Sequence, residues 1–232
     1  MSRDETHGKV SYDWYGSWTT LYNMFADAVL CFHLEGTDAE VNSYGGDGQT
    51  PLKPPHDGDV GFIPRSIYLR QSRWYHYVRQ KYGLPLDSRH LYTKSDWEFF
   101  AMAVSSPQTR HEILQSVAMW VNETATDRPL TDLYNTEGDG GFPGPNFFAR
   151  PVVGGHFAFL ALEKACNGKA MDGLDFLDKQ QFYDEEEREE IDWSHGGWNA
   201  ESGQPRDQNK ADEGVINFQG QDESQVKMGF NF

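Results

Sequence analysis

Apolar side chains recur at three- and four-residue steps in separate stretches of the chain, and this periodicity predicts an all-α fold. The first stretch is clear in Trp18, Leu21 and Phe25, which share one face of a helix. The predicted helices span residues 14–33, 64–82, 93–105, 106–123 and 151–166. Amphipathic helices need neighbours to cover their apolar faces, so we expect about five main helices around one core.

Capping signals place two of these helices. Thr93 and Asp96, like Ser95 and Glu98, have the spacing of a capping box, which predicts a helix start within residues 93–95. Ser106 followed by Pro107 is typical of an N-cap with proline at the first helical position. The short break between these two helices predicts an antiparallel hairpin.

The helix predicted at 151–166 is apolar nearly all round, which is typical of a buried helix. Gly154 and Gly155 would weaken an isolated helix, so we expect them to allow close approach of a neighbouring backbone. His156, beside this pair, is predicted to be a core histidine with its hydrogen bonds satisfied.

Charge and composition divide the 232-residue chain. The net charge is −16, and residues 167–232 carry sixteen acidic and six basic side chains. We therefore predict a polar, frayed segment at 1–13, a globular domain at 14–166, and an acidic, mostly disordered tail at 167–232, where a short helix could form after Gly173. Residues 36–60, rich in Gly and Pro, form a long loop within the domain.

The acidic net charge also argues against two classes of partner. An acidic chain without clustered Lys and Arg predicts neither nucleic acid nor an anionic membrane as a partner. No stretch approaches membrane-spanning length. No Cys/His cluster has zinc spacing, so we expect no metal and no cofactor.

Cys31 and Cys166 lie in apolar helical surroundings; we expect buried free thiols, with a disulfide as the open alternative. The first residues lack the apolar run of a signal peptide, which is compatible with a cytoplasmic location.

The stretch Lys81–Phe100, KYGLPLDSRHLYTKSDWEFF, combines charged side chains with aromatic rings. Leu84-Pro85 favours an extended or turn conformation before the helix that starts near residue 95. Charged groups at a helix N-terminus can converge on a ligand there. Alternatively, these charges pair with one another and hold a loop against the helix.

Five segments in this order resemble the central domain of the fungal glutaminase A family. They are SWTTLYNMFADAVL at 17–30, IPRSIYLRQSRWY at 63–75, the stretch at 81–100, RPLTDLYNT at 128–136 and FFARPVVGGHFAFLAL at 147–162. The resemblance implies an α/α toroid of six helical hairpins, as in many glycoside hydrolases, of which this chain matches the C-terminal part. It also implies hydrolysis of the side-chain amide of L-glutamine, an extracellular family, and residues 36–60 as an insertion. Helix faces without their neighbours could cause self-association.

Amide hydrolysis needs a nucleophile or an activated water, donors for the oxyanion, and an acid for the leaving ammonia. Asp87 and Asp132, in helix-joining segments, are the predicted bases or ammonium acceptors, and Asp96 is a third catalytic candidate or a helix cap. Arg89 and Arg150 could clamp a carboxylate. The predicted pocket-lining residues are Tyr92, Trp97 and Tyr134, with core packing as the alternative. His90 could transfer protons near neutral pH.

Two other functions stay open from the sequence. The same carboxylates, with aromatic side chains to stack on sugar rings, could hydrolyse a glycan, and the separation of the Asp87 and Asp132 carboxyls would discriminate this case. The chain could instead be inactive and serve as an interaction module. No Ser/His/Asp set has a nucleophile-elbow GxSxG context, so the sequence gives little support to a serine hydrolase.

Overall fold

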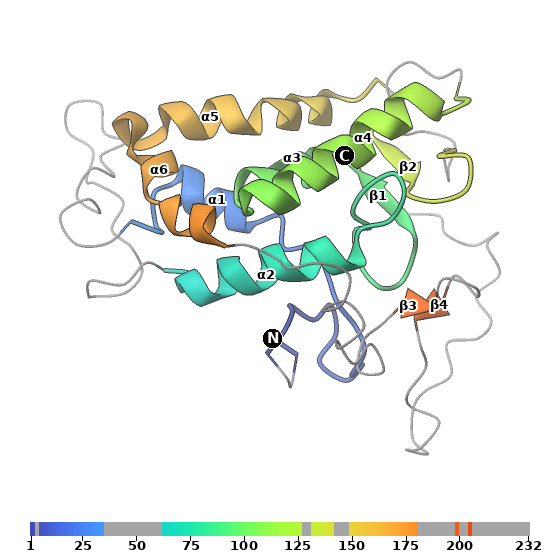
Figure 1. Cartoon of the computed structure of the whole chain (residues 1–232), viewed down its shortest axis with the longest axis horizontal. Coiled ribbons are helices and arrows are strands. Elements are labelled where there is room, and N and C mark those ends of the chain that lie inside the picture. The colour runs from blue at the N-terminus through green and yellow to red at the C-terminus, as the bar shows by residue number, and fades with distance from the viewer. Residues whose placement is uncertain are drawn as a thin grey trace, which may run out of the picture.

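The computed structural model describes residues 1–2, 5–34, 62–126, 131–141 and 149–180, together with the backbone of two short strands, Trp198–Asn199 and Gln204–Pro205. Within these residues the fold is mostly helical, which confirms the predicted all-α class. Figure 1 shows α3 (Ser95–Ala103) running between α5 (Ala158–Lys164) above it and α2 (Arg65–Val78) below it. No helix in this described part of the chain is long and apolar enough to cross a membrane.

The first predicted helix, 14–33, is wrong over much of its length. Only α1 (Met24–Val29) is α-helical. Before it, the backbone is used in long-range hydrogen bonds: the N–H of Thr20 donates to the carbonyl of Leu86 at 2.9 Å, and the N–H of Ser88 donates to the carbonyl of Trp18 at 3.0 Å. These contacts hold residues 18–20 extended against the loop before α3, because a backbone N–H bonded across the fold cannot also close a helical turn.

Helix α2 ends at Val78, four residues before its predicted end. The N–H of Gln80 donates to the carbonyl of Gly83 at 2.8 Å. Gly83 has a φ of 140°, a backbone angle that residues with a Cβ rarely adopt. The turn at 80–83 therefore replaces the last predicted helical turn. Tyr68, Trp74 and Tyr75, on one face of α2, are buried.

The helical hairpin begins where the capping signals predict. The side chain of Ser106 accepts a hydrogen bond from the N–H of Thr109, Pro107 is the first helical residue, and α4 extends over Pro107–Glu123. Helix α3 starts at Ser95, within the predicted range. Before it, β1 (Tyr92–Lys94) pairs antiparallel with β2 (Leu133–Asn135), a small ribbon that periodicity did not predict.

The segment predicted as a buried helix at 151–166 differs from that prediction. Its first half is the 3₁₀-helix η2 (Pro151–Phe157), its second half is α5, and Phe157 and Leu160 are 64% and 57% exposed. The segment packs against α3, α1 and α6, while the exposed Phe157 and Leu160 leave part of its apolar sequence uncovered by the described residues. Gly155 does make the predicted close approach, since a Cβ there would lie 2.7 Å from the Cβ of Asp96.

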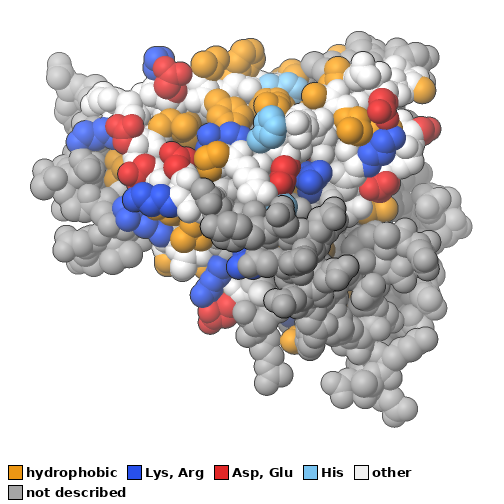
Figure 2. Space-filling view, viewed as in Figure 1, with side chains coloured by type: hydrophobic (Ala, Val, Ile, Leu, Met, Phe, Trp, Pro, Cys, Tyr) orange, Lys and Arg blue, Asp and Glu red, His pale blue; other side chains and the backbone are white. Residues whose placement is uncertain are grey.

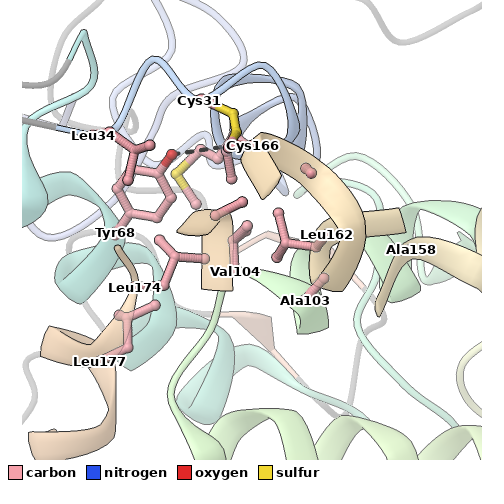
Figure 3. Packing of buried hydrophobic residues seen from close by; sticks show 14 residues of the cluster. Cys31, Leu34, Tyr68, Ala103, Val104, Ala158, Leu162, Cys166, Leu174 and Leu177 are labelled. Atoms are coloured by element: carbon pink, nitrogen blue, oxygen red, sulfur yellow. Dashed lines mark hydrogen bonds between the residues drawn. A yellow bond between two sulfur atoms is a disulfide. The ribbon is translucent and has the colours of Figure 1, made fainter. Parts of the chain in front are cut away.

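The main core lies where α1, α2, α5 and the following turns meet (Figure 3). A disulfide joins Cys31 to Cys166, with Cα atoms 6.2 Å apart and a sequence separation of 135. The expectation of free thiols is therefore wrong: the chain brings two distant apolar segments together, which helical context alone does not reveal. A second cluster packs Trp74 and Trp18 against α3 and α4.

Packing continues beyond the segment expected to form the domain. After η3 (Ala165–Gly168) and α6 (Lys169–Asp172), Leu174 and Leu177 are buried in the main core, the latter within η4 (Asp175–Lys179). At the other end, His7 is buried and stacks on Trp74 with ring centroids 4.0 Å apart. The division at 13 and 166 stays a prediction. The loop predicted at 36–60 lies outside the described residues. So does the tail beyond 180, apart from the backbone of β3 (Trp198–Asn199) and β4 (Gln204–Pro205), which pair antiparallel.

Candidate functional site

A group of charged and polar side chains gathers at the N-terminal end of α3, where β1 and η2 also meet. The N–H of Ser95, the first residue of α3, donates to the carbonyl of Asp132 at 2.8 Å. Asp132, which directly precedes β2, therefore lies at the start of α3. On the face drawn in Figure 2, histidine side chains lie among hydrophobic ones, with an acidic and a basic side chain close by.

Asp132 and Arg150 form a bidentate ion pair. The guanidinium Nε of Arg150 donates to Oδ1 of Asp132 at 2.8 Å, and its Nη2 donates to Oδ2. The Asp132 side chain is 2% exposed and that of Arg150 is 31% exposed. Hydrogen bonding to Asp132 raises the pKa of Arg150, so this guanidinium stays charged. The pair anchors the segment before η2 to the ribbon.

Asp96 is the second carboxylate of the group. It is buried in the first turn of α3, and its Oδ2 lies 3.6 Å from Nζ of Lys94. Its Oδ1 has no hydrogen-bond partner in the described part of the chain. Burial raises the pKa of Asp96, and the nearby charge of Asp132 adds to this. The charge of Lys94 and the backbone N–H groups of Asp96 and Trp97 oppose it. A buried carboxyl oxygen without a partner is costly, which makes Asp96 a place for a bound donor.

His156 lies beside Ser95, with Nε2 2.9 Å from the serine Oγ. The imidazole stacks on Phe99 with centroids 4.5 Å apart and is half-buried. Burial lowers the pKa of His156, while the carboxylates of Asp96 and Asp132 act in the opposite direction. The expectation of a core histidine misses this position at the rim of a charged group.

Trp97 lies next in α3 and is half-buried. Its ring stacks on Tyr22 with centroids 3.7 Å apart, and Nζ of Lys94 lies 5.5 Å from the ring centroid. Protein groups therefore already contact this ring.

Asp87 and Arg89 form a separate pair in the turn before β1. Both carboxylate oxygens of Asp87 accept from Arg89, from its backbone N–H at 2.8 Å, Nε at 2.9 Å and Nη2 at 2.7 Å. Tyr92 stacks on His90 beyond this turn. The structure does not join this pair by a hydrogen bond or ion pair to Asp96 or Asp132 in the described residues, so it shapes the loop, as in the alternative stated for these charges.

Tyr134 lies in the core. It is fully buried, stacks on Trp120 at 3.8 Å, and donates its hydroxyl to the carboxylate of Glu98 at 2.5 Å. Glu98 also accepts from the N–H of Leu84 at 2.8 Å, so it does not close the capping box that its spacing to Ser95 suggests. Burial raises the pKa of Glu98 to about 8.

Sequence reasoning missed Ser95 and Lys94 as members of this group, and it missed the position of His156 beside Ser95. The Gly154-Gly155 pair was the usable signal, because a glycine that admits a neighbouring backbone also brings the next side chain close to it. No cluster of three or more His, Cys, Asp or Glu side chains suited to a metal ion occurs in the residues that the structure describes.

Comparison with known proteins gives consistent matches. Residues 58–160 match the sequence model of a family described as "Glutaminase A six helical-hairpin domain". A probable glutaminase of Arthroderma benhamiae is 76% identical over 178 residues, which cover 77% of this chain and 20% of that protein. Glutaminase A of Aspergillus oryzae is 50% identical over 104 residues, covering 44% of this chain and 15% of that protein. The chain thus spans about a fifth or less of these relatives.

The family match agrees with the predicted architecture, a partial α/α toroid built from helical hairpins. No solved structure shows significant similarity to the chain.

Proposed function

We propose that the chain contributes to a hydrolase site for the side-chain amide of L-glutamine, releasing glutamate and ammonia, because residues 58–160 match the sequence model of the glutaminase A six helical-hairpin domain. The relatives' names, glutaminase and probable glutaminase, supply the substrate class. In this proposal the site is the group at the N-terminal end of α3, comprising Asp96, Asp132 and Arg150 with the side chains that touch them.

The observation that carries the proposal is the buried Oδ1 of Asp96, which lacks a partner among the described residues. A free amino acid presents an ammonium and a carboxylate on one carbon, so its recognition needs an anion and a cation close together. Asp96 lies within electrostatic reach of both Asp132 and Arg150, and Lys94 lies 3.6 Å from its other oxygen. This alternation of charge suits a zwitterion.

The individual roles follow from the environments. Asp96 accepts a hydrogen bond from the substrate ammonium, and the cationic groups of Lys94 and Arg150 attract its carboxylate. Asp132 holds Arg150 in place through two hydrogen bonds. Asp87 and Arg89 stay outside the site in this proposal, because their pair in the turn before β1 has no hydrogen bond or ion pair to Asp96 or Asp132 among the described residues.

A glycoside hydrolase is the second candidate, supported by the coupled carboxylates of Asp96 and Asp132. It is weakened by Trp97, the aromatic side chain nearest to them in sequence, because Tyr22 and Lys94 already contact its ring. A glycan would need an aromatic face that the protein leaves open.

Ammonia release from L-glutamine by the purified chain tests the proposal, with L-asparagine and soluble glucans as competing substrates. We expect glutamine to be hydrolysed and Asp96→Asn to raise KM, since an amide cannot replace the anion that binds ammonium. Asp172→Asn, an exposed aspartate on α6, is the matched control. Sugar release without ammonia would favour the glycan function, and neither product from a folded chain would favour an interaction module.

A further inference from the structure

We propose that Ser95 is the nucleophile and His156 the general base of this site, so that the acyl group of the amide passes onto the serine oxygen. This inference rests on the proposed hydrolase function and deepens it. It is carried by the 2.9 Å contact between Oγ of Ser95 and Nε2 of His156, which joins two segments 61 residues apart in sequence. A hydroxyl within hydrogen-bond reach of an imidazole is the arrangement that activates a serine.

The fold holds both partners in place. Ser95 is fixed by its backbone, whose N–H donates to the carbonyl of Asp132, and by its position as the first residue of α3. His156 is fixed by stacking on Phe99 and by Gly155, which lies so close to α3 that a Cβ would meet the Cα of Asp96 at 3.1 Å. A nucleophile and base held by rigid elements lose little entropy when they react.

The surrounding charges suit proton transfer. Burial lowers the pKa of His156, so the ring is neutral near pH 7 and its Nε2 can accept the serine proton. The carboxylates of Asp96 and Asp132 act on the same ring and stabilise the imidazolium once it forms. Neither acid is hydrogen-bonded to the ring in the described residues, so they supply the charge stabilisation of a triad acid, while stacking on Phe99 orients the ring.

The reaction balances as a two-step hydrolysis. The Oγ of Ser95 forms a bond to the amide carbon while its proton moves to Nε2 of His156. The C–N bond then breaks, and the same proton passes to the leaving ammonia. Water attacks the resulting ester, gives one proton to His156, and releases the acid as the proton returns to Oγ. The net change is amide plus water giving acid plus ammonia.

Access limits the substrate class. Ser95 is 3% exposed, while the imidazole beside it is half-buried. A chain of sugar rings or a folded protein cannot reach such an oxygen, so the substrate must present a narrow group, such as the terminal carboxamide of a free amino acid. We therefore assign the site to small primary amides.

Labelling with a small alkyl fluorophosphonate, which reacts with activated serines, tests the nucleophile independently of any substrate. We expect one label on the folded chain, located at Ser95 by peptide mapping and absent in Ser95→Ala. His156→Gln should slow labelling by about 10²- to 10⁴-fold, the usual contribution of a general base. Ser66→Ala and His111→Gln, which alter exposed side chains on α2 and α4, should label as the unaltered chain does.

A second variant guards against misfolding of Ser95→Ala. In Ser95→Cys the new thiol should be alkylated by iodoacetamide, and additional His156→Gln should slow this reaction at pH 7, because the imidazole no longer accepts the thiol proton. Near-UV circular dichroism verifies the fold of each variant. No label at Ser95 on the folded chain, or labelling that is equally fast in His156→Gln, overturns the inference.

The two proposals fail separately. If glutamine is hydrolysed and Ser95→Ala keeps normal turnover, the nucleophile is wrong and the glutaminase function stands. If Ser95 is labelled in a His156-dependent way and glutamine is not a substrate, the nucleophile stands and the proposed substrate is wrong.

Discussion

Tyr134 donates its hydroxyl to the carboxylate of Glu98 at 2.5 Å, in a part of the core where both side chains are buried. The other carboxylate oxygen of Glu98 accepts from the N–H of Leu84 at 2.8 Å. These two donors tie α3 to β2 and to the turn that precedes β1. A carboxyl group in this position is satisfied by hydrogen bonds yet far from solvent, so its ionisation has consequences for stability.

Stability should fall with rising pH because of Glu98. Burial raises its pKa from 4.5 to about 8, so between these values the folded chain binds a proton that the unfolded chain has released. The contribution is complete below about pH 4.5 and is lost as the pH rises through about 8. Glu98→Gln, which cannot ionise, should flatten this dependence. Urea unfolding at pH 5, 6.5 and 8 measures it, with exposed Glu163→Gln as the control. Parallel curves for Glu98→Gln and the unaltered chain would contradict the prediction.

Gly155→Ala should disrupt the contact between η2 and α3. A Cβ at this position would lie 2.7 Å from the Cβ of Asp96, closer than side chains tolerate, so η2 must shift at a cost of about 1–3 kcal/mol. Gly154→Ala is the matched control, since a Cβ there meets no atom within 4 Å. Thermal unfolding measures both variants. Equal melting temperatures for them would show that the close approach is unimportant.

Arg150→Ala should destabilise the fold strongly, because it leaves the buried carboxylate of Asp132 without its two donors. Removing one partner of a buried ion pair costs about 3–5 kcal/mol, and the 31% exposure of the Arg150 side chain places the expected loss at the lower end. Lys164→Ala breaks the exposed pair with Glu163 and should cost about 1 kcal/mol or less. Guanidinium chloride unfolding compares the two. A loss in Arg150→Ala no larger than in Lys164→Ala would contradict the buried pair.

Reduction of the Cys31–Cys166 bond should lower stability. The bond closes a loop of more than one hundred residues, for which the loop-entropy account gives about 4–5 kcal/mol. The double variant Cys31→Ala with Cys166→Ala should melt at a lower temperature than the oxidised chain and should not respond to dithiothreitol. Intact mass before and after alkylation verifies the bond, and two alkylated thiols in the untreated chain would exclude it.

Local signals in the sequence predicted what depends on neighbours along the chain. Ser106 and Pro107 mark the start of α4 because a serine cap and a proline at the first position act within one helical turn. The burial of Tyr68 and Trp74 likewise follows from helical periodicity. Asp132 was selected by its charge in a helix-joining segment, Asp96 by its place in a first helical turn, and Arg150 as a possible clamp for a carboxylate. The structure brings these three together.

Long-range pairing decided the remainder. Ser95 and His156 are each unremarkable in sequence, and they meet because the glycine at 155 allows η2 to lie against α3. Periodicity predicts a helix at residues 18–20, yet the backbone there hydrogen-bonds to the loop at 86–88.

The sequence by itself determined the helical class, the start of the α3–α4 hairpin, the uneven charge and the types of side chain available to a site. Only the tertiary structure decided which of those side chains are neighbours. It separated the Asp87–Arg89 turn from the group around Asp96, buried Tyr134 beside Glu98, and joined Cys31 to Cys166. The physical reason is that caps and helical faces act over three or four residues, whereas ion pairs, stacked rings and disulfides depend on how distant segments pack.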